Sequence, residues 1–316
     1  MAIPYNSFIN SREMGQMVDV GGPITHCIDD GQGPPMLFLH GLGFSLFTFR
    51  RNYPYFVRNM RIVAPDLPGC GYSRLPWNYG AKPEDMAKYL KALLEQLSIE
   101  RAAVCGAGEG GVYALELALR YPGTVSALIL SSPGSLTRYF PKHIRQLLGP
   151  VLGQFRVNAM NSGHIRDFMK WCYFNEIDVD KYLVKQVYQP FENRLARQVL
   201  LRLLKDYDDH YVHENLNKIK CPTLTVWGDG DAGRPAGMAE HYRRAIPGSS
   251  LQIMRNCGML PHEEKHHEFN ERVEEFLLSA LPELLPAAGI GLSEQLPEYL
   301  QYENIDDEYG AYDEYE

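Results

Sequence analysis

The chain has 316 residues, of which 45% are hydrophobic and 22% charged, a globular composition that excludes wholesale disorder. No apolar run reaches the ~18 residues of a membrane-spanning helix, and the N-terminus lacks the basic and apolar segments of a secretory signal. The net charge of −8 arises from residues 290–316, which hold nine acids and no Lys or Arg. Because the remainder is close to neutral, we expect no nucleic-acid binding.

The six cysteines lie far apart in the sequence and include no CxxC pair. This spacing argues against a zinc site and against a disulfide framework. We therefore expect a cytoplasmic protein with no metal and no cofactor.

Short apolar runs alternate with helix-like stretches, which is typical of βαβ units around a parallel sheet. Strands are expected at residues 35–40, 61–66, 101–105, 125–130, 222–227 and 251–254. Helices are expected at residues 83–97, 110–121 and 263–281. We therefore predict an α/β fold.

The pattern is helical only between residues 134 and 216, and a helical block inserted late in a parallel sheet is expected to cover the carboxyl ends of the strands. We therefore predict a core formed by residues 1–133 and 217–282, with residues 134–216 as a helical lid over a pocket. Residues 283–316 are rich in Pro, Glu and Tyr and are predicted to be a flexible acidic tail. The tail either stays solvated or binds a basic surface, which would make it a contact for a protein partner or for self-association.

Three motifs in the first half of the chain point to one family. His40-Gly41-Leu42-Gly43 follows a predicted strand, residues 66–73 read DLPGCGYS, and residues 104–111 read VCGAGEGG and lead into a predicted helix. In this order they resemble the HGxG oxyanion loop, the DxPGxGxS turn and the GxSxG nucleophile elbow of the α/β-hydrolase superfamily. The resemblance covers about residues 16–282. It implies a mostly parallel sheet of about eight strands, with helices on both faces.

The same resemblance exposes two departures from the catalytic triad. It assigns Gly108 to the position of the nucleophilic serine, Asp231 to the acid and Met259 to the histidine. Glycine has no side chain with which to attack, and a thioether cannot exchange protons at neutral pH, so ordinary Ser-His-Asp hydrolysis is not expected. Sliding the elbow by one residue would nominate Glu109, but the surrounding glycines would then lose their register.

Other residues of this region are assigned by the same resemblance. It implies an oxyanion loop and pocket formed by His40, Gly41, Leu42, Gly43, Gly108, Glu109 and Met259, with the N–H groups of Leu42 and Glu109 as oxyanion donors. His262 and Cys257 are alternative acid–base or nucleophilic groups, although His262 also suits a structural role at a helix entry. Asp231, without a histidine partner, also suits a role as the cap of a turn.

Three hypotheses for function follow. The first is a non-hydrolytic, triad-degenerate pseudoenzyme that binds a small, largely apolar ligand or a partner in the pocket beneath the lid. The second is a non-hydrolytic enzyme, such as a lyase, isomerase or cyclase, that uses the oxyanion hole and pocket acid–base groups. The third is a hydrolase or esterase with a relocated nucleophile, and it requires another hydroxyl or thiol beside an imidazole at the same edge of the sheet.

Overall fold

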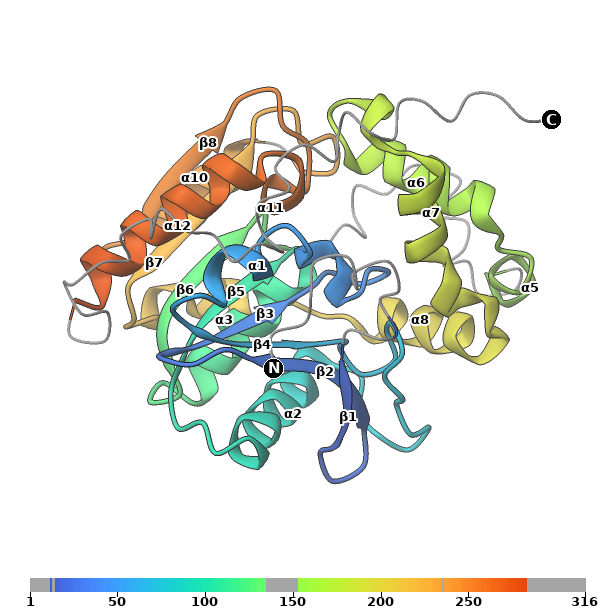
Figure 1. Cartoon of the computed structure of the whole chain (residues 1–316), viewed down its shortest axis with the longest axis horizontal. Helices are drawn as coiled ribbons and strands as arrows, with labels where there is room; N and C mark the ends of the chain where they lie inside the picture. Colours follow the sequence, from blue (N-terminus) through green and yellow to red (C-terminus); the bar gives the residue numbers. More distant parts are fainter. Residues whose placement is uncertain (1–11, 13–14, 135–152, 235, 283–316) are drawn as a thin grey trace.

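A computed structural model describes residue 12 and residues 15–134, 153–234 and 236–282, and within them eight strands form one sheet (Figure 1). The strands are β1 (Gln16–Asp19), β2 (Ile24–Asp30), β3 (Pro35–Leu39), β4 (Arg61–Pro65), β5 (Ala102–Ala107), β6 (Val125–Ser131), β7 (Thr223–Gly228) and β8 (Ser250–Met254). Their order is β1-β2-β4-β3-β5-β6-β7-β8. The pairs from β4 to β8 are parallel, whereas β1 and β2 are added in antiparallel fashion. The predicted α/β-hydrolase fold is therefore confirmed.

Helices cover both faces of this sheet. They are α1 (Tyr53–Phe56), α2 (Pro83–Gln96), α3 (Glu109–Arg120), α5 (Gly153–Asn158), α6 (Ser162–Cys172), α7 (Lys181–Tyr188), α8 (Arg194–Asp206), α9 (His210–Asn215), α10 (Ala236–Ala245), α11 (Pro261–Glu264) and α12 (His266–Ala280). One apolar cluster lies between the sheet and α12 and includes Phe38 and Phe269, and a second packs α2 and α3 against the other face and includes Leu90 and Leu115. The sheet is thus buried on both sides, as parallel strands require.

The described part of the inserted segment, residues 153–216, contains helices and no strand. In Figure 1 helices α5 to α8 gather on the side of the molecule away from α10 and α12. The end of α6 contacts the loop after β8, because the Met259 N–H donates to the Cys172 carbonyl at 2.8 Å and the Phe174 N–H donates to Glu264 at 2.8 Å. Residues 135–152 of the predicted lid, and the whole predicted tail, lie outside the described residues.

Two details of the predicted elements were wrong. The antiparallel strands β1 and β2 were not predicted, since β2 carries polar and charged residues along with its buried ones. The predicted helix at residues 263–281 is divided into α11 and α12, because the backbone at Lys265 leaves the helical region, with φ −124° and ψ 43°. In the described parts of the chain, no helix is both long and apolar enough to span a membrane.

Candidate functional site

Gly108 lies at the junction between β5 and α3 with φ 55° and ψ −123°, a conformation that side chains rarely adopt. Close packing of the strand against the helix fixes this turn. A Cβ on Gly106 would lie 2.5 Å from the Gly110 carbonyl oxygen, and one on Gly110 would lie 2.2 Å from the Leu39 carbonyl oxygen. The backbone therefore forms the strained strand-to-helix turn with Gly108 at its apex, and Glu109 is the first residue of α3.

The loop after β3 is held by His40. The Leu67 N–H donates to His40 Nε2 at 2.9 Å, so Nδ1 carries the proton and donates to the Gly41 carbonyl at 2.8 Å. Burial lowers the pKa of His40, which keeps the ring neutral in this role. His40 thus positions the loop and does not line the pocket.

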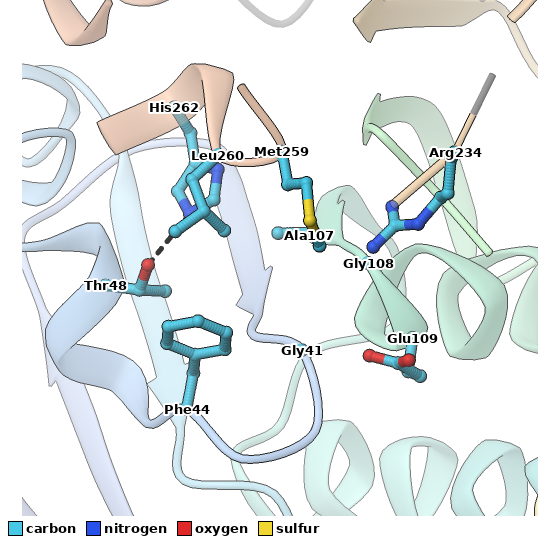
Figure 2. Close-up of a pocket in the computed structure, with 10 residues that line it drawn as sticks. All are labelled: Gly41, Phe44, Thr48, Ala107, Gly108, Glu109, Arg234, Met259, Leu260 and His262. Atoms are coloured by element: carbon cyan, nitrogen blue, oxygen red, sulfur yellow. Dashed lines mark hydrogen bonds between the residues drawn. The ribbon is translucent and has the colours of Figure 1, made fainter. Parts of the chain in front are cut away.

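The expected oxyanion donor Leu42 already has an acceptor in this structure. Its N–H donates to Glu109 Oε2 at 3.1 Å, so the side chain of Glu109, and not only its backbone, belongs to the site. Glu109 is 2% exposed, and Figure 2 shows its carboxylate turned towards the loop at Gly41. A carboxylate therefore lies beside the apex of the elbow, a placement that sequence motifs alone did not indicate.

Met259 occupies the opposite wall, and Figure 2 shows its thioether directed at Ala107 and Gly108. Its loop is fixed by Glu264, whose carboxylate accepts the N–H groups of Gly258 at 3.0 Å and Leu260 at 3.3 Å. Burial raises the pKa of Glu264 to about 7, although these N–H groups favour the charged form. The loop thus presents an apolar side chain to the pocket.

The loop after β7 contributes an arginine rather than its acid. Asp231 Oδ1 accepts the N–H groups of Gly233 at 2.9 Å and Arg234 at 2.8 Å, so Asp231 caps a turn and does not line the pocket. Burial raises the pKa of Asp231, although Arg234 and these N–H groups lower it. Arg234 is 2% exposed, and a Cβ placed on Gly108 would lie 3.5 Å from its Nη2.

His262 is fully buried between two hydroxyl groups. Its Nε2 lies 3.0 Å from Thr48 Oγ1, on the short helix Leu46–Phe49, and its Nδ1 lies 3.0 Å from Ser131 Oγ at the end of β6. Burial lowers the pKa of His262 to about 4, so the ring is neutral at pH 7. The structure therefore places two hydroxyls beside an imidazole at the carboxyl edge of the sheet.

The directions of these hydrogen bonds can be assigned from the donors available. The Thr48 hydroxyl donates to Glu263 Oε2 at 2.7 Å, because a carboxylate only accepts. The Thr48 oxygen must then accept a hydrogen bond from His262 Nε2–H, and His262 Nδ1 accepts a hydrogen bond from the Ser131 hydroxyl. The pair formed by Glu263 and Arg50 completes a buried network. His262 is thus a base towards Ser131, which does not line the pocket, and a donor towards Thr48, which does.

Cys257 is buried and does not line the pocket. Burial raises the pKa of its thiol, so the thiolate needed for nucleophilic attack is disfavoured.

These residues meet in one small pocket, in which the volume open to the centre of a water molecule is about 10 Å³. Of the residues predicted for the site, Gly41, Gly108, Glu109, Met259 and His262 line it, whereas His40, Leu42, Gly43, Asp231 and Cys257 do not. The other lining residues, which sequence reasoning missed, are Phe44, Thr48, Ala107, Arg234 and Leu260. Phe44, Ala107 and Leu260 are adjacent in the sequence to predicted site residues, whereas no motif pointed to Thr48 or Arg234.

Comparisons with known proteins agree with this fold. A family profile described as alpha/beta hydrolase fold matches residues 34–266, and the chain belongs to that family. A 2-hydroxy-6-oxononadienedioate/2-hydroxy-6-oxononatrienedioate hydrolase of Cupriavidus pinatubonensis is 28% identical over 80% of this chain and 90% of its own length. Monoacylglycerol lipase abhd6-B of Xenopus laevis is 25% identical over 79% of this chain and 77% of its own length.

A solved structure of similar fold is the S103A mutant of the meta-cleavage product hydrolase CumD from Pseudomonas fluorescens IP01, complexed with acetates. It has a TM-score of 0.74 and 22% sequence identity, and the match covers 85% of this chain and 99% of that one. Carboxylesterase CesB from Bacillus subtilis has a TM-score of 0.73 and 22% identity over 88% of this chain and 96% of its own.

Proposed function

We propose that the protein is an enzyme that moves a proton on a small substrate by carboxylate acid–base catalysis, as an isomerase, lyase or cyclase does, without an acyl-enzyme. The observation that carries this proposal is the buried carboxylate of Glu109, which lines the pocket next to the apex of the elbow. It is an acid–base group beside the position that in this family holds a nucleophile. Named relatives are a hydrolase and a lipase, which favours an active enzyme over a pseudoenzyme that only binds.

The proposed step uses the Glu109 carboxylate, which lines the pocket, and the Leu42 N–H, which lies behind it and donates to that carboxylate at 3.1 Å. The Glu109 carboxylate takes a proton from a substrate carbon next to a carbonyl. The electron pair of the broken C–H bond forms the C=C bond of an enolate, and the π pair of the carbonyl moves onto its oxygen. As Glu109 moves towards that proton, it releases the Leu42 N–H, which then donates a hydrogen bond to the enolate oxygen. The positive end of the α3 dipole also stabilises the negative charge on this oxygen. Protonated Glu109 returns the proton to another carbon in an isomerisation, or to a leaving group in an elimination.

Hydrogen–deuterium exchange tests this proposal without knowledge of the natural substrate. Short ketones and 2-oxo acids are incubated with the protein in D₂O, and deuterium uptake next to the carbonyl is followed by NMR. We expect the wild type to accelerate exchange for at least one compound, and Glu109→Gln to reduce the acceleration by ~100-fold or more. The exposed Glu100→Gln should exchange like the wild type. Exchange that survives in Glu109→Gln, or that the wild type never accelerates, contradicts the proposal.

A second candidate, a hydrolase with a relocated nucleophile, is favoured by the 2.7 Å hydrogen bond from the Thr48 hydroxyl to the carboxylate of Glu263. The Thr48 hydroxyl lines the pocket, and in this candidate Glu263 accepts its proton during attack on an ester, while His262 Nε2–H continues to donate to Thr48. Intact-mass analysis after treatment with an activated acetyl ester separates the two candidates. An acetyl group on Thr48 that is lost in Thr48→Val supports the hydrolase, and no adduct at that residue excludes it.

A further inference from the structure

Arg234 is a buried cation with two nitrogens that lack an acceptor. Its Nε and Nη1 are inaccessible to solvent and have no hydrogen-bond partner. Within the residues that the structure describes, Arg234 forms no ion pair with a carboxylate at 4.0 Å or less. Arg50, whose side chain is 16% exposed, is by contrast paired with the buried Glu263. A guanidinium removed from water normally requires hydrogen-bond acceptors, because its desolvation is otherwise not compensated.

The guanidinium is aimed at the elbow. Figure 2 shows its end directed at Gly108, and a Cβ on that residue would lie 3.5 Å from Nη2. Helix α3, with 12 residues, begins at the next residue, so the positive end of its dipole faces the same point. Two independent sources of positive potential therefore meet at Gly108, where the missing side chain leaves space.

The remaining lining of the pocket limits which anion fits. Arg234 is the single cation and Glu109 the single carboxylate among the ten lining residues, and His262 is neutral at pH 7. Phe44, Ala107, Met259 and Leu260 make the remaining walls largely apolar. A dianionic phosphate would meet the carboxylate across an apolar space with only one cation to balance it. A carboxylate carries one charge, and its two oxygens match the fork of a guanidinium.

We propose that the pocket binds a small carboxylate-bearing molecule, with its carboxylate on Arg234 at the space beside Gly108 and its apolar body against Phe44 and Met259. This proposal names small carboxylates as the substrate class of the enzyme proposed above. That carboxylates are substrates rests on the proposed function, whereas that they bind does not. Binding itself requires Arg234, whereas proton transfer requires Glu109.

Ligand-observed NMR titration tests the proposal with a series of short carboxylates, from propanoate to hexanoate and including 2-oxo acids. The matched amides and inorganic phosphate serve as comparison probes. We expect at least one carboxylate to bind at least 10-fold more tightly than its amide and than phosphate. Arg234→Gln should weaken that carboxylate by 10-fold to 100-fold, and Arg234→Lys, which keeps the charge but not the fork, by a smaller factor. The exposed Arg243→Gln is the matched control and should bind normally.

Each outcome is decisive. Equal binding of amides, tighter binding of phosphate, no carboxylate binding to the wild type, or full binding to a folded Arg234→Gln variant overturns the carboxylate site. Failure of the proposed enzyme looks different, because carboxylates would then bind the wild type through Arg234 without any deuterium exchange. Glu109→Gln should bind carboxylates at least as tightly as the wild type, since it removes a negative charge from the pocket.

Discussion

Replacing Arg234 by methionine should leave the free protein as stable as the wild type or make it more stable. Methionine keeps most of the aliphatic length of the side chain and removes a charge whose desolvation costs several kcal/mol. The main loss is attraction to Asp231, whose pKa Arg234 lowers. These two described side chains form no ion pair at 4.0 Å or less. At an effective dielectric constant of about 20 their attraction is therefore below about 4 kcal/mol. The two effects nearly cancel, and we expect a change below about 1 kcal/mol, or a gain.

Arg50→Met is the matched comparison, because Arg50 is also largely buried but is paired with Glu263. Removing this partner leaves a buried carboxylate uncompensated, which should lower the free energy of unfolding by about 3–5 kcal/mol. Urea unfolding followed by circular dichroism measures both variants against the wild type. A loss of more than about 2 kcal/mol in Arg234→Met would show that the guanidinium has an internal partner, and the argument for a bound anion would then fail.

Two further predictions concern strain and pH. Gly108→Ala should lower the free energy of unfolding by about 1–2 kcal/mol, because the strain of alanine at φ 55° outweighs the entropy that alanine removes from the unfolded chain. Gly123 faces open space, so Gly123→Ala should be neutral or slightly stabilising in the same urea assay. His262 has its folded pKa lowered to about 4 from 6.5, so the unfolded state binds more protons between these values and stability falls as the pH is lowered. Between pH 7 and pH 5 the contribution of His262 to the free energy of unfolding should fall by about 2 kcal/mol. This loss should be absent in His262→Gln and present in His267→Gln, which changes an exposed histidine. An equal dependence of the free energy of unfolding on pH in both variants would contradict the buried neutral ring.

The part of the fold that could be predicted from sequence is the part encoded locally. The strands β3, β5 and β6 are short, mostly apolar runs, and each elbow glycine stands at a fixed place in a local motif. The antiparallel strands β1 and β2 carry charged and polar residues such as Asp29 and His26, and their pairing is set by distant partners. The short apolar runs that mark the parallel strands are absent from β1 and β2.

The candidate site shows the same division. Gly108 and Met259 were placed by motifs that keep a fixed distance from a strand end. The roles of Glu109, Thr48 and Arg234 depend on where side chains from separate loops meet, as in the bond from Leu42 to Glu109, which joins residues 67 positions apart. The sequence assigned Glu109 mainly as a backbone donor and nominated its side chain only through a shifted elbow, because the direction of a side chain is a tertiary property.

The sequence motifs predict that Gly108 and Met259 occupy the triad positions of the serine and the histidine, and on that prediction their identity and the presence of Arg234 are physically connected. In a serine–histidine relay the imidazole becomes a cation when it takes the proton of the hydroxyl. A second cation about 5 Å away would oppose that charge by about 3 kcal/mol at an effective dielectric constant of 20. Arg234 lies beside Gly108 and, in Figure 2, between it and the loop after β7, so it would disfavour such a relay, whereas the apolar Met259 carries no such conflict.

This conflict predicts how the site responds to repair. Gly108→Ser/Met259→His should hydrolyse an activated ester poorly, and adding Arg234→Met should raise the rate of hydrolysis by ~100-fold, the factor that corresponds to about 3 kcal/mol. Arg243→Gln added to the same double variant is the control for removing a positive charge elsewhere, and it should leave the rate unchanged. A double variant as active as the triple one would show that Arg234 does not disfavour the imidazolium. The place of a buried arginine beside the elbow would then have no connection with the absence of a serine and a histidine at Gly108 and Met259.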